Sequence, residues 1–95
     1  MMKLIINTIS SEKITPKKKM AEGDYVFTAG YIDRDDHGPN YTWLTWESRS
    51  VHNPTEGDMA TQAQKFLTDT DNWHPYLEGY DIDQEARTIH MGFGS

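Results

Sequence analysis

The sequence contains no cysteine. This absence excludes disulfide bonds, cysteine-ligated zinc and a cysteine nucleophile, and in a small domain it favours a reducing compartment. Long hydrophobic runs are also missing, because the N-terminal run of residues 4–6 is followed at once by polar residues. Such a run is too short for a signal peptide or a membrane span. We therefore expect a cytoplasmic protein with no membrane association.

Recognisable catalytic and ligand-binding patterns are absent as well. The histidines show no zinc-type spacing, no serine lies in a Gly-x-Ser-x-Gly elbow, and no glycine-rich phosphate loop opens a helix. Residues 33–37 combine three aspartates with His37, a set that can ligate a divalent cation, although aspartate is also typical of solvated turns. We therefore expect that the protein is not an enzyme and that it binds neither a metal ion nor a cofactor. A small metal-dependent enzyme that uses residues 33–37 remains an alternative.

Acidic residues, in contrast, are abundant. The net charge is −6, which opposes sequence-independent binding of nucleic acid. The charge is uneven: residues 1–23 hold five lysines against two glutamates, whereas residues 54–86 hold eight acids against one lysine. Such a distribution fits either two ordinary solvated faces or an acidic surface directed at a basic partner.

The length of 95 residues predicts a single domain over residues 1–95. Residue patterns predict strands over residues 3–9, 24–33 and 41–51. The last two strands flank the turn-forming residues 34–40 and are expected to pair as a β-hairpin. Residues 10–23 include Pro16, three consecutive lysines and Gly23, and are predicted to form a mobile basic loop.

Side-chain alternation assigns two faces to this hairpin. The expected core face of the first strand carries Tyr25, Phe27, Ala29 and Tyr31. The expected register places Tyr31 opposite Trp46 and Trp43 opposite Arg34. Trp46 then points inward and Trp43 outward, and a slip of one residue would exchange the faces.

The second half of the chain predicts one amphipathic helix and one further strand. Asn53 is expected to cap the helix, with Pro54 in its first turn and Gly57 weakening that turn by about 1 kcal/mol. Apolar residues then recur at helical spacing, at Met59, Ala60, Ala63, Phe66 and Leu67. Residues 73–80 are predicted to be an aromatic loop or short helical turn, and residues 87–93 a strand.

Together these elements predict an α+β fold. Its expected sheet is mostly antiparallel, with about four strands in the order β, β-hairpin, α, β and with the helix packed on one face.

Exposed rings and carboxylates are the remaining candidates for function. Exposed tryptophan and tyrosine are enriched in interface hot spots, although Trp43 could instead stack with Arg34 in a local cation–π pair. A second group of rings, formed by Trp73, His74, Tyr76 and Tyr80, lies within the acidic residues 54–86. Rings and carboxylates together would suit contact with a basic protein surface. The predicted partner-binding residues are Arg34, Tyr41, Trp43, Trp73, Tyr76, Glu78, Asp81 and Asp83.

The predicted function is that of a small non-enzymatic binding module that occupies the basic surface of another protein. An inhibitor of phage or mobile-element type, or an immunity protein, acts in this way. One alternative is a homodimer or larger assembly that pairs through the N- or C-terminal strand as an open sheet edge. Another is a single-stranded nucleic-acid binder that uses lysines 17–19 with Tyr41 and Trp43.

Overall fold

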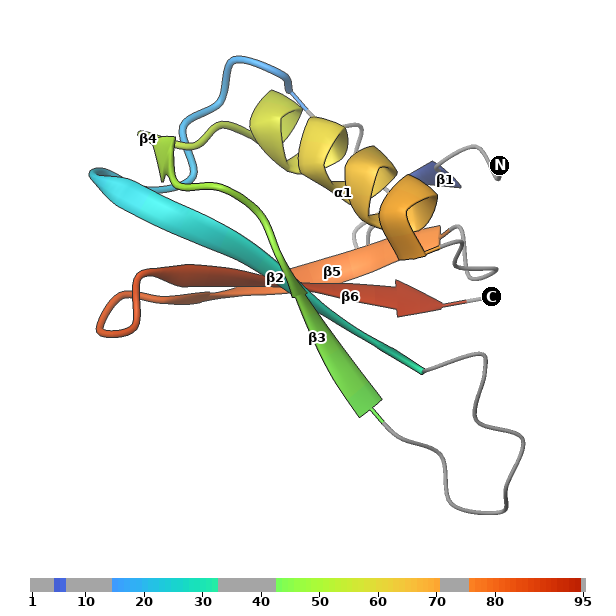
Figure 1. Ribbon diagram of the computed structural model, residues 1–95. Coiled ribbons are helices and arrows are strands. Elements are labelled where there is room, and N and C mark those ends of the chain that lie inside the picture. The colour runs from blue at the N-terminus through green and yellow to red at the C-terminus, as the bar shows by residue number, and fades with distance from the viewer. Residues whose placement is uncertain (1–4, 7–14, 33–42, 71–75, 95) are drawn as a thin grey trace.

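The computed structural model describes residues 5–6, 15–32, 43–70 and 76–94. Within these ranges the chain forms a sheet with one helix on one face, so the predicted α+β class is confirmed (Figure 1). The elements are β1 (Ile5–Ile6), β2 (Asp24–Ile32), β3 (Trp43–Glu47), β4 (Val51–His52), α1 (Glu56–Thr70), β5 (Tyr76–Asp83) and β6 (Thr88–Gly94).

The sheet is mixed rather than mostly antiparallel. Its order is β1-β5-β6-β2-β3, and β4 pairs with β2. The β2–β3, β2–β4 and β5–β6 ladders are antiparallel, whereas β2–β6 and β1–β5 are parallel. A parallel ladder needs a long connection, and the chain supplies one between β2 and β6 through β3, β4, α1 and β5.

Residues 73–80 were predicted to form a loop or a short helical turn, and this prediction is wrong for residues 76–80, which belong to strand β5. Residues 73–75 lie outside the described part of the chain. The register of the β5–β6 ladder shifts between Leu77 and Gly79. A bulge of this kind interrupts the strict alternation of side chains that identifies a strand in the sequence. Because of this bulge at Gly79, the sequence pattern of residues 76–80 did not indicate a strand.

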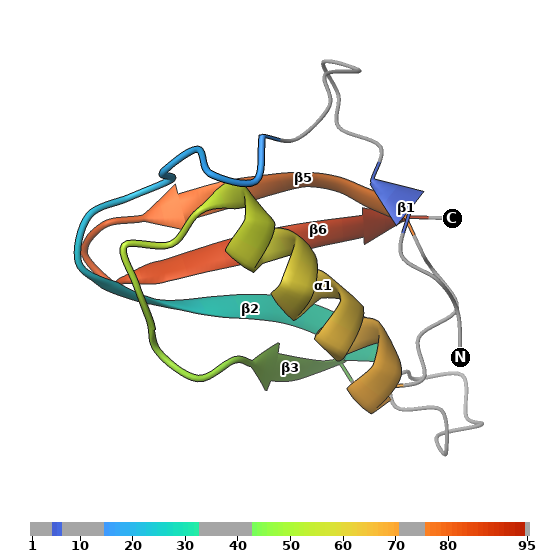
Figure 2. The same ribbon diagram turned by 90° about the horizontal axis from the view of Figure 1, so that it is seen from above.

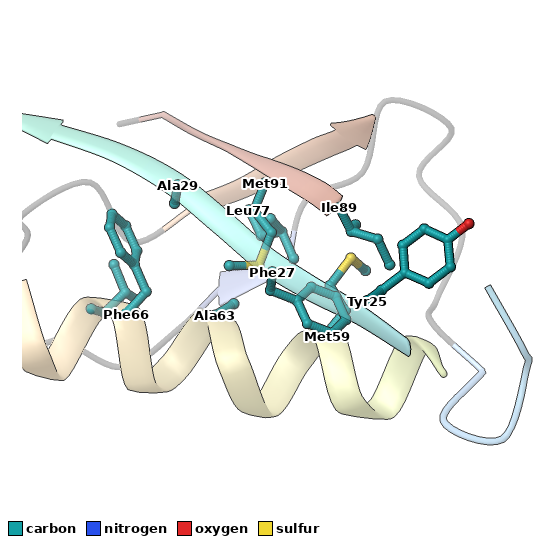
Figure 3. Close-up of a cluster of buried hydrophobic side chains, with 10 residues drawn as sticks. Tyr25, Phe27, Ala29, Met59, Ala63, Phe66, Leu77, Ile89 and Met91 are labelled. Atoms are coloured by element: carbon teal, nitrogen blue, oxygen red, sulfur yellow. The ribbon is translucent and has the colours of Figure 1, made fainter. Parts of the chain in front are cut away.

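The core lies between α1 and one face of the sheet. Figure 2 shows α1 crossing β6 and β2 obliquely, and Figure 3 shows buried side chains of β2 and α1 meeting between them. The buried hydrophobic residues are Tyr25, Phe27, Ala29, Met59, Ala63, Phe66, Leu67, Leu77, Ile89 and Met91. The predicted inward faces of β2 and α1 are thus confirmed.

The β2–β3 hairpin pairing is confirmed, but its predicted register is wrong by two residues. Ala29 lies opposite Trp46, Tyr31 opposite Leu44, and Ile32 opposite Trp43. Because the error is an even number, every side chain keeps its predicted face. The connecting residues 33–42, including Arg34, lie outside the described part of the chain.

The helix is capped two residues later than predicted, at Thr55 instead of Asn53. Thr55 and Asp58 form a reciprocal box: the backbone N–H of Asp58 donates to Thr55 Oγ1 over 3.1 Å, and the Thr55 N–H donates to Asp58 Oδ2 over 2.9 Å. Asn53, the predicted cap, has a φ of 47° and accepts a hydrogen bond from the Gly23 N–H at its Oδ1. Its side chain therefore joins two distant segments and leaves the capping to Thr55.

Thr55→Ala is expected to lower the free energy of unfolding by about 1 kcal/mol, because the Asp58 N–H loses its acceptor. Thr55→Ser keeps a hydroxyl and should retain most of the stability. Urea denaturation of both variants measures the difference. Equal losses in the two variants would show that the hydroxyl does not cap the helix.

Residues 15–20 lie against the beginning of α1. The Met20 N–H donates to the Pro54 carbonyl, and the Glu56 N–H donates to the Lys18 carbonyl. A further hydrogen bond runs from the Gly57 N–H to the Pro16 carbonyl. These contacts fasten the described part of the predicted loop to the helix, while the mobility of residues 10–23 stays a prediction.

Candidate functional site

The face of the sheet turned away from α1 has no described element over it (Figure 1). We call it the open face. Alternation and register place on it Val26, Thr28, Gly30, Ile32, Trp43, Thr45, Glu47, Asp81, Asp83, Thr88, His90 and Gly92. As far as the described residues extend, this face is free for contact with another molecule.

A polar row crosses the open face from one strand to the next. Thr28 is the register partner of Glu47 on β3 and of His90 on β6, and His90 is the partner of Asp81 on β5. The hydroxyl of Thr28, a residue only 8% exposed, is hydrogen-bonded to His90 Nδ1 over 2.9 Å. This bond satisfies a hydroxyl near the centre of the sheet and holds the imidazole in place.

Beside this row lies a shallow hollow of about 280 Å³. Its floor contains Gly79 and Gly92, which are register partners, and its lining includes Glu78, Asp81 and His90. A Cβ at Gly92 would meet no atom nearer than the Gly79 carbonyl oxygen at 3.8 Å. The missing side chain of Gly92 therefore leaves this space open. Its size is just below the range of about 300–1,000 Å³ that is typical of small-molecule pockets.

The charge of the sheet is entirely negative in the described strands. They contain no lysine or arginine, and all of their carboxylates are exposed, namely Asp24, Glu47, Glu78, Asp81 and Asp83. The Asp24 carboxylate lies 2.8 Å from His52 Nδ1. Within the described residues Glu47, Glu78 and Asp81 form no ion pair. No described cation therefore neutralises the charge of these three carboxylates.

Trp43 adds a large apolar surface at the β3 side of this face. Its side chain is 69% exposed, which agrees with its predicted outward orientation. The indole leans over β2, where a Cβ on Gly30 would lie 3.6 Å from Trp43 Cε3. Because Gly30 has no side chain, the ring can lie close to the sheet while most of its surface stays exposed.

The predicted partner-binding residues divide into three groups. Trp43, Asp81 and Asp83 lie on the open face, and Glu78 lines the hollow there. Tyr76 begins β5. Arg34, Tyr41 and Trp73 lie outside the described residues, as does the 33–37 cluster.

Sequence reasoning missed Glu47, Thr28 and His90 as parts of this site. Alternation alone put each of them on an outward face, but only the parallel pairing of β2 with β6 brings Thr28 beside His90. Among the described residues no group of three histidines or acids is placed to hold a metal.

The lysines at 17–19 and Trp43 are not brought together. The lysines lie in the segment hydrogen-bonded to the start of α1, whereas Trp43 lies on the face turned away from that helix. A joint surface for single-stranded nucleic acid would need both on one side.

No described helix is both long and apolar enough to span a membrane. Compared with protein-family models, curated proteins and solved structures, the chain shows no match in any of the three.

Proposed function

We propose that this protein is a non-enzymatic binding module that docks its open face on a basic surface of another protein. The observation that carries the proposal is the charge of the described strands: five exposed carboxylates, no lysine and no arginine, and no described element over the open face. In this proposal the protein acts in the cytoplasm by covering a surface of its partner, as an inhibitor or an immunity protein does.

Two physical effects support this proposal. A surface of one sign attracts an oppositely charged partner and raises the rate of encounter. Trp43 then provides an amphipathic ring at the edge of the same face, and tryptophan is enriched among residues that dominate interface energies. The carboxylates of Glu47, Asp81 and Asp83 would therefore attract the partner, and the Trp43 ring would hold the same partner by direct contact.

The test neutralises acids on the open face and compares them with acids elsewhere. One variant combines Glu47→Gln, Asp81→Asn and Asp83→Asn. Its control combines Glu22→Gln, Glu56→Gln and Glu85→Gln, which changes the net charge equally on other parts of the surface. We expect the open-face variant to bind an oligolysine peptide about tenfold more weakly than the control does, since each exposed ion pair contributes about 0.2–1 kcal/mol.

Titration calorimetry at low and high salt measures these affinities. Binding by the unmodified protein should weaken as salt rises, because exposed charges are screened beyond a Debye length of about 8 Å at physiological ionic strength. An affinity that ignores salt, or an equal loss in both triple variants, would contradict docking through the open face.

Self-association is a second candidate, because β3 is an edge strand of the described sheet and carries the exposed Trp43. The expectation that the C-terminal strand forms an open edge is wrong, since β6 lies between β5 and β2. The N-terminal strand β1 does lie at an edge. A monomer in sizing experiments at high concentration would exclude this candidate.

A further inference from the structure

A second hollow lies away from the open face, where residues 20–25 meet the turn between β5 and β6. We call it the corner pocket. Its volume is about 520 Å³, within the range of about 300–1,000 Å³ typical of small-molecule sites. Met20, Ala21 and Ile82 form the apolar part of its lining, and all three are partly buried against the core, whereas Glu22, Gln84 and Arg87 form the polar part.

Polar groups converge on this pocket from two sides. Tyr25 lines it, and Figure 3 shows the Tyr25 hydroxyl pointing away from the buried cluster. Arg87 lines it as well, with its guanidinium carbon 5.5 Å from the centroid of the Tyr25 ring. The pocket therefore offers both apolar and polar contacts to a ligand.

The guanidinium of Arg87 has donors to spare. Its Nη1 donates to the Glu22 carbonyl over 3.2 Å, one bond for a group with five N–H donors. The Glu22 carboxylate is paired with Lys19 over 3.2 Å, and among the described residues no acid forms an ion pair with Arg87. A cation with no acidic partner in the described part of the chain is notable in a protein of net charge −6.

The backbone at Arg87 is held in a conformation that favours glycine. Its φ is 58°, and the other positive values in the described chain belong to Gly23 and Asn53. The three lie close together, since the Gly23 N–H donates to Asn53 Oδ1 and Arg87 Nη1 donates to the carbonyl of Glu22, the residue before Gly23. A strained residue other than glycine is a reason to look for a use of its side chain.

From this geometry we propose that the corner pocket binds a small monocarboxylate with an apolar body. The carboxylate would pair with the Arg87 guanidinium, whose forked donors match a carboxylate's two oxygens. The apolar body would lie against Met20, Ala21 and Ile82. This site is separate from the open face and does not depend on the function proposed there.

Hexanoate, hexanol and hexylamine are matched probes, since they share a six-carbon chain and differ in the head group. Titrations of the full chain by ¹H–¹⁵N NMR should show saturable shifts at Met20, Ala21, Ile82 and Arg87 with hexanoate. Hexanol should bind at least about tenfold more weakly, because it lacks the charge-assisted hydrogen bonds to Arg87. Hexylamine should bind no better than hexanol. Equal affinities for hexanoate and hexanol, or shifts that never saturate, would overturn the proposal.

Arg87→Gly removes the guanidinium and suits the positive φ, so the fold should survive. We expect hexanoate to bind this variant at least about tenfold more weakly. Arg49→Gly, the matched control, replaces an exposed arginine that does not line the pocket and should bind hexanoate like the unmodified chain. Ala21→Leu tests the pocket independently: it fills the apolar wall, keeps Arg87 and should also weaken binding. Unchanged hexanoate affinity in either Arg87→Gly or Ala21→Leu would place the ligand elsewhere and refute the site.

Discussion

Replacing Phe66 by alanine is expected to lower the free energy of unfolding by about 3–5 kcal/mol, the usual loss for a buried phenylalanine. Phe66 on α1 is fully buried. Its ring lies 4.8 Å from the Phe93 ring, 5.6 Å from the Trp46 ring and 6.2 Å from the Tyr31 ring, measured between centroids. These partners come from three strands, so a single truncation leaves a cavity where the helix meets β2, β3 and β6.

A loss of this size is large for such a small domain. Stabilities of about 0.05–0.15 kcal/mol per residue are typical, so Phe66→Ala removes a substantial part of the total. Trp43→Ala is the matched control, because this ring is 69% exposed and its removal should change stability by less than about 0.5 kcal/mol. Urea denaturation followed by circular dichroism distinguishes the two. If Trp43→Ala proves as damaging as Phe66→Ala, the exposed ring supports the fold and its role in binding must be reconsidered.

Gly57→Ala is expected to destabilise the protein by about 1–3 kcal/mol, the usual range for added atoms in a closely packed place. Helix propensity alone predicts the opposite, a gain of about 1 kcal/mol. The sign changes because a Cβ at Gly57 would lie 2.8 Å from the Pro16 carbonyl oxygen and 3.2 Å from Pro16 Cα. The same carbonyl accepts the Gly57 N–H over 3.1 Å.

Urea denaturation gives the sign of this change, and hydrogen exchange at the Gly57 amide reports whether the segment around Pro16 has moved away. Thr61→Ala serves as the control, because Thr61 is exposed on the same helix and alanine there should gain up to about 0.7 kcal/mol in propensity. A stabilised Gly57→Ala protein would mean that Pro16 yields freely, and that its contact with α1 contributes little.

The periodicity of apolar residues was sufficient to predict which side chains of β2 and α1 face the core. The alternation in β2 correctly assigned Phe27 and Ala29 to the core, and the helical spacing did the same for Met59 and Phe66. Burial of alternate or every third to fourth side chain leaves this pattern directly in the sequence. The outward orientation of Trp43 followed from the same rule even though the register was displaced.

Contacts between segments that are distant in the sequence could not be predicted from periodicity. Asn53 and Thr55 both resemble helix caps, and only the hydrogen bond from Gly23 to the Asn53 side chain decides between them. The strand order was equally hidden, because nothing local to residues 26–28 or 88–90 marks the two segments as neighbours. The row from Glu47 through Thr28 and His90 to Asp81 depends on that order, so this part of the site required the structure.

The parallel ladder of β2 and β6 also constrains the time course of folding. It joins Val26 to Thr88 and Thr28 to His90, so the central strand acquires its second neighbour only when segments some sixty residues apart meet. Closing so long a loop costs entropy before the ladder repays it, and folds rich in such pairings form slowly. On the ribosome, β2 must wait for β6 to emerge, and until then the edge that β6 will cover stays open to other chains.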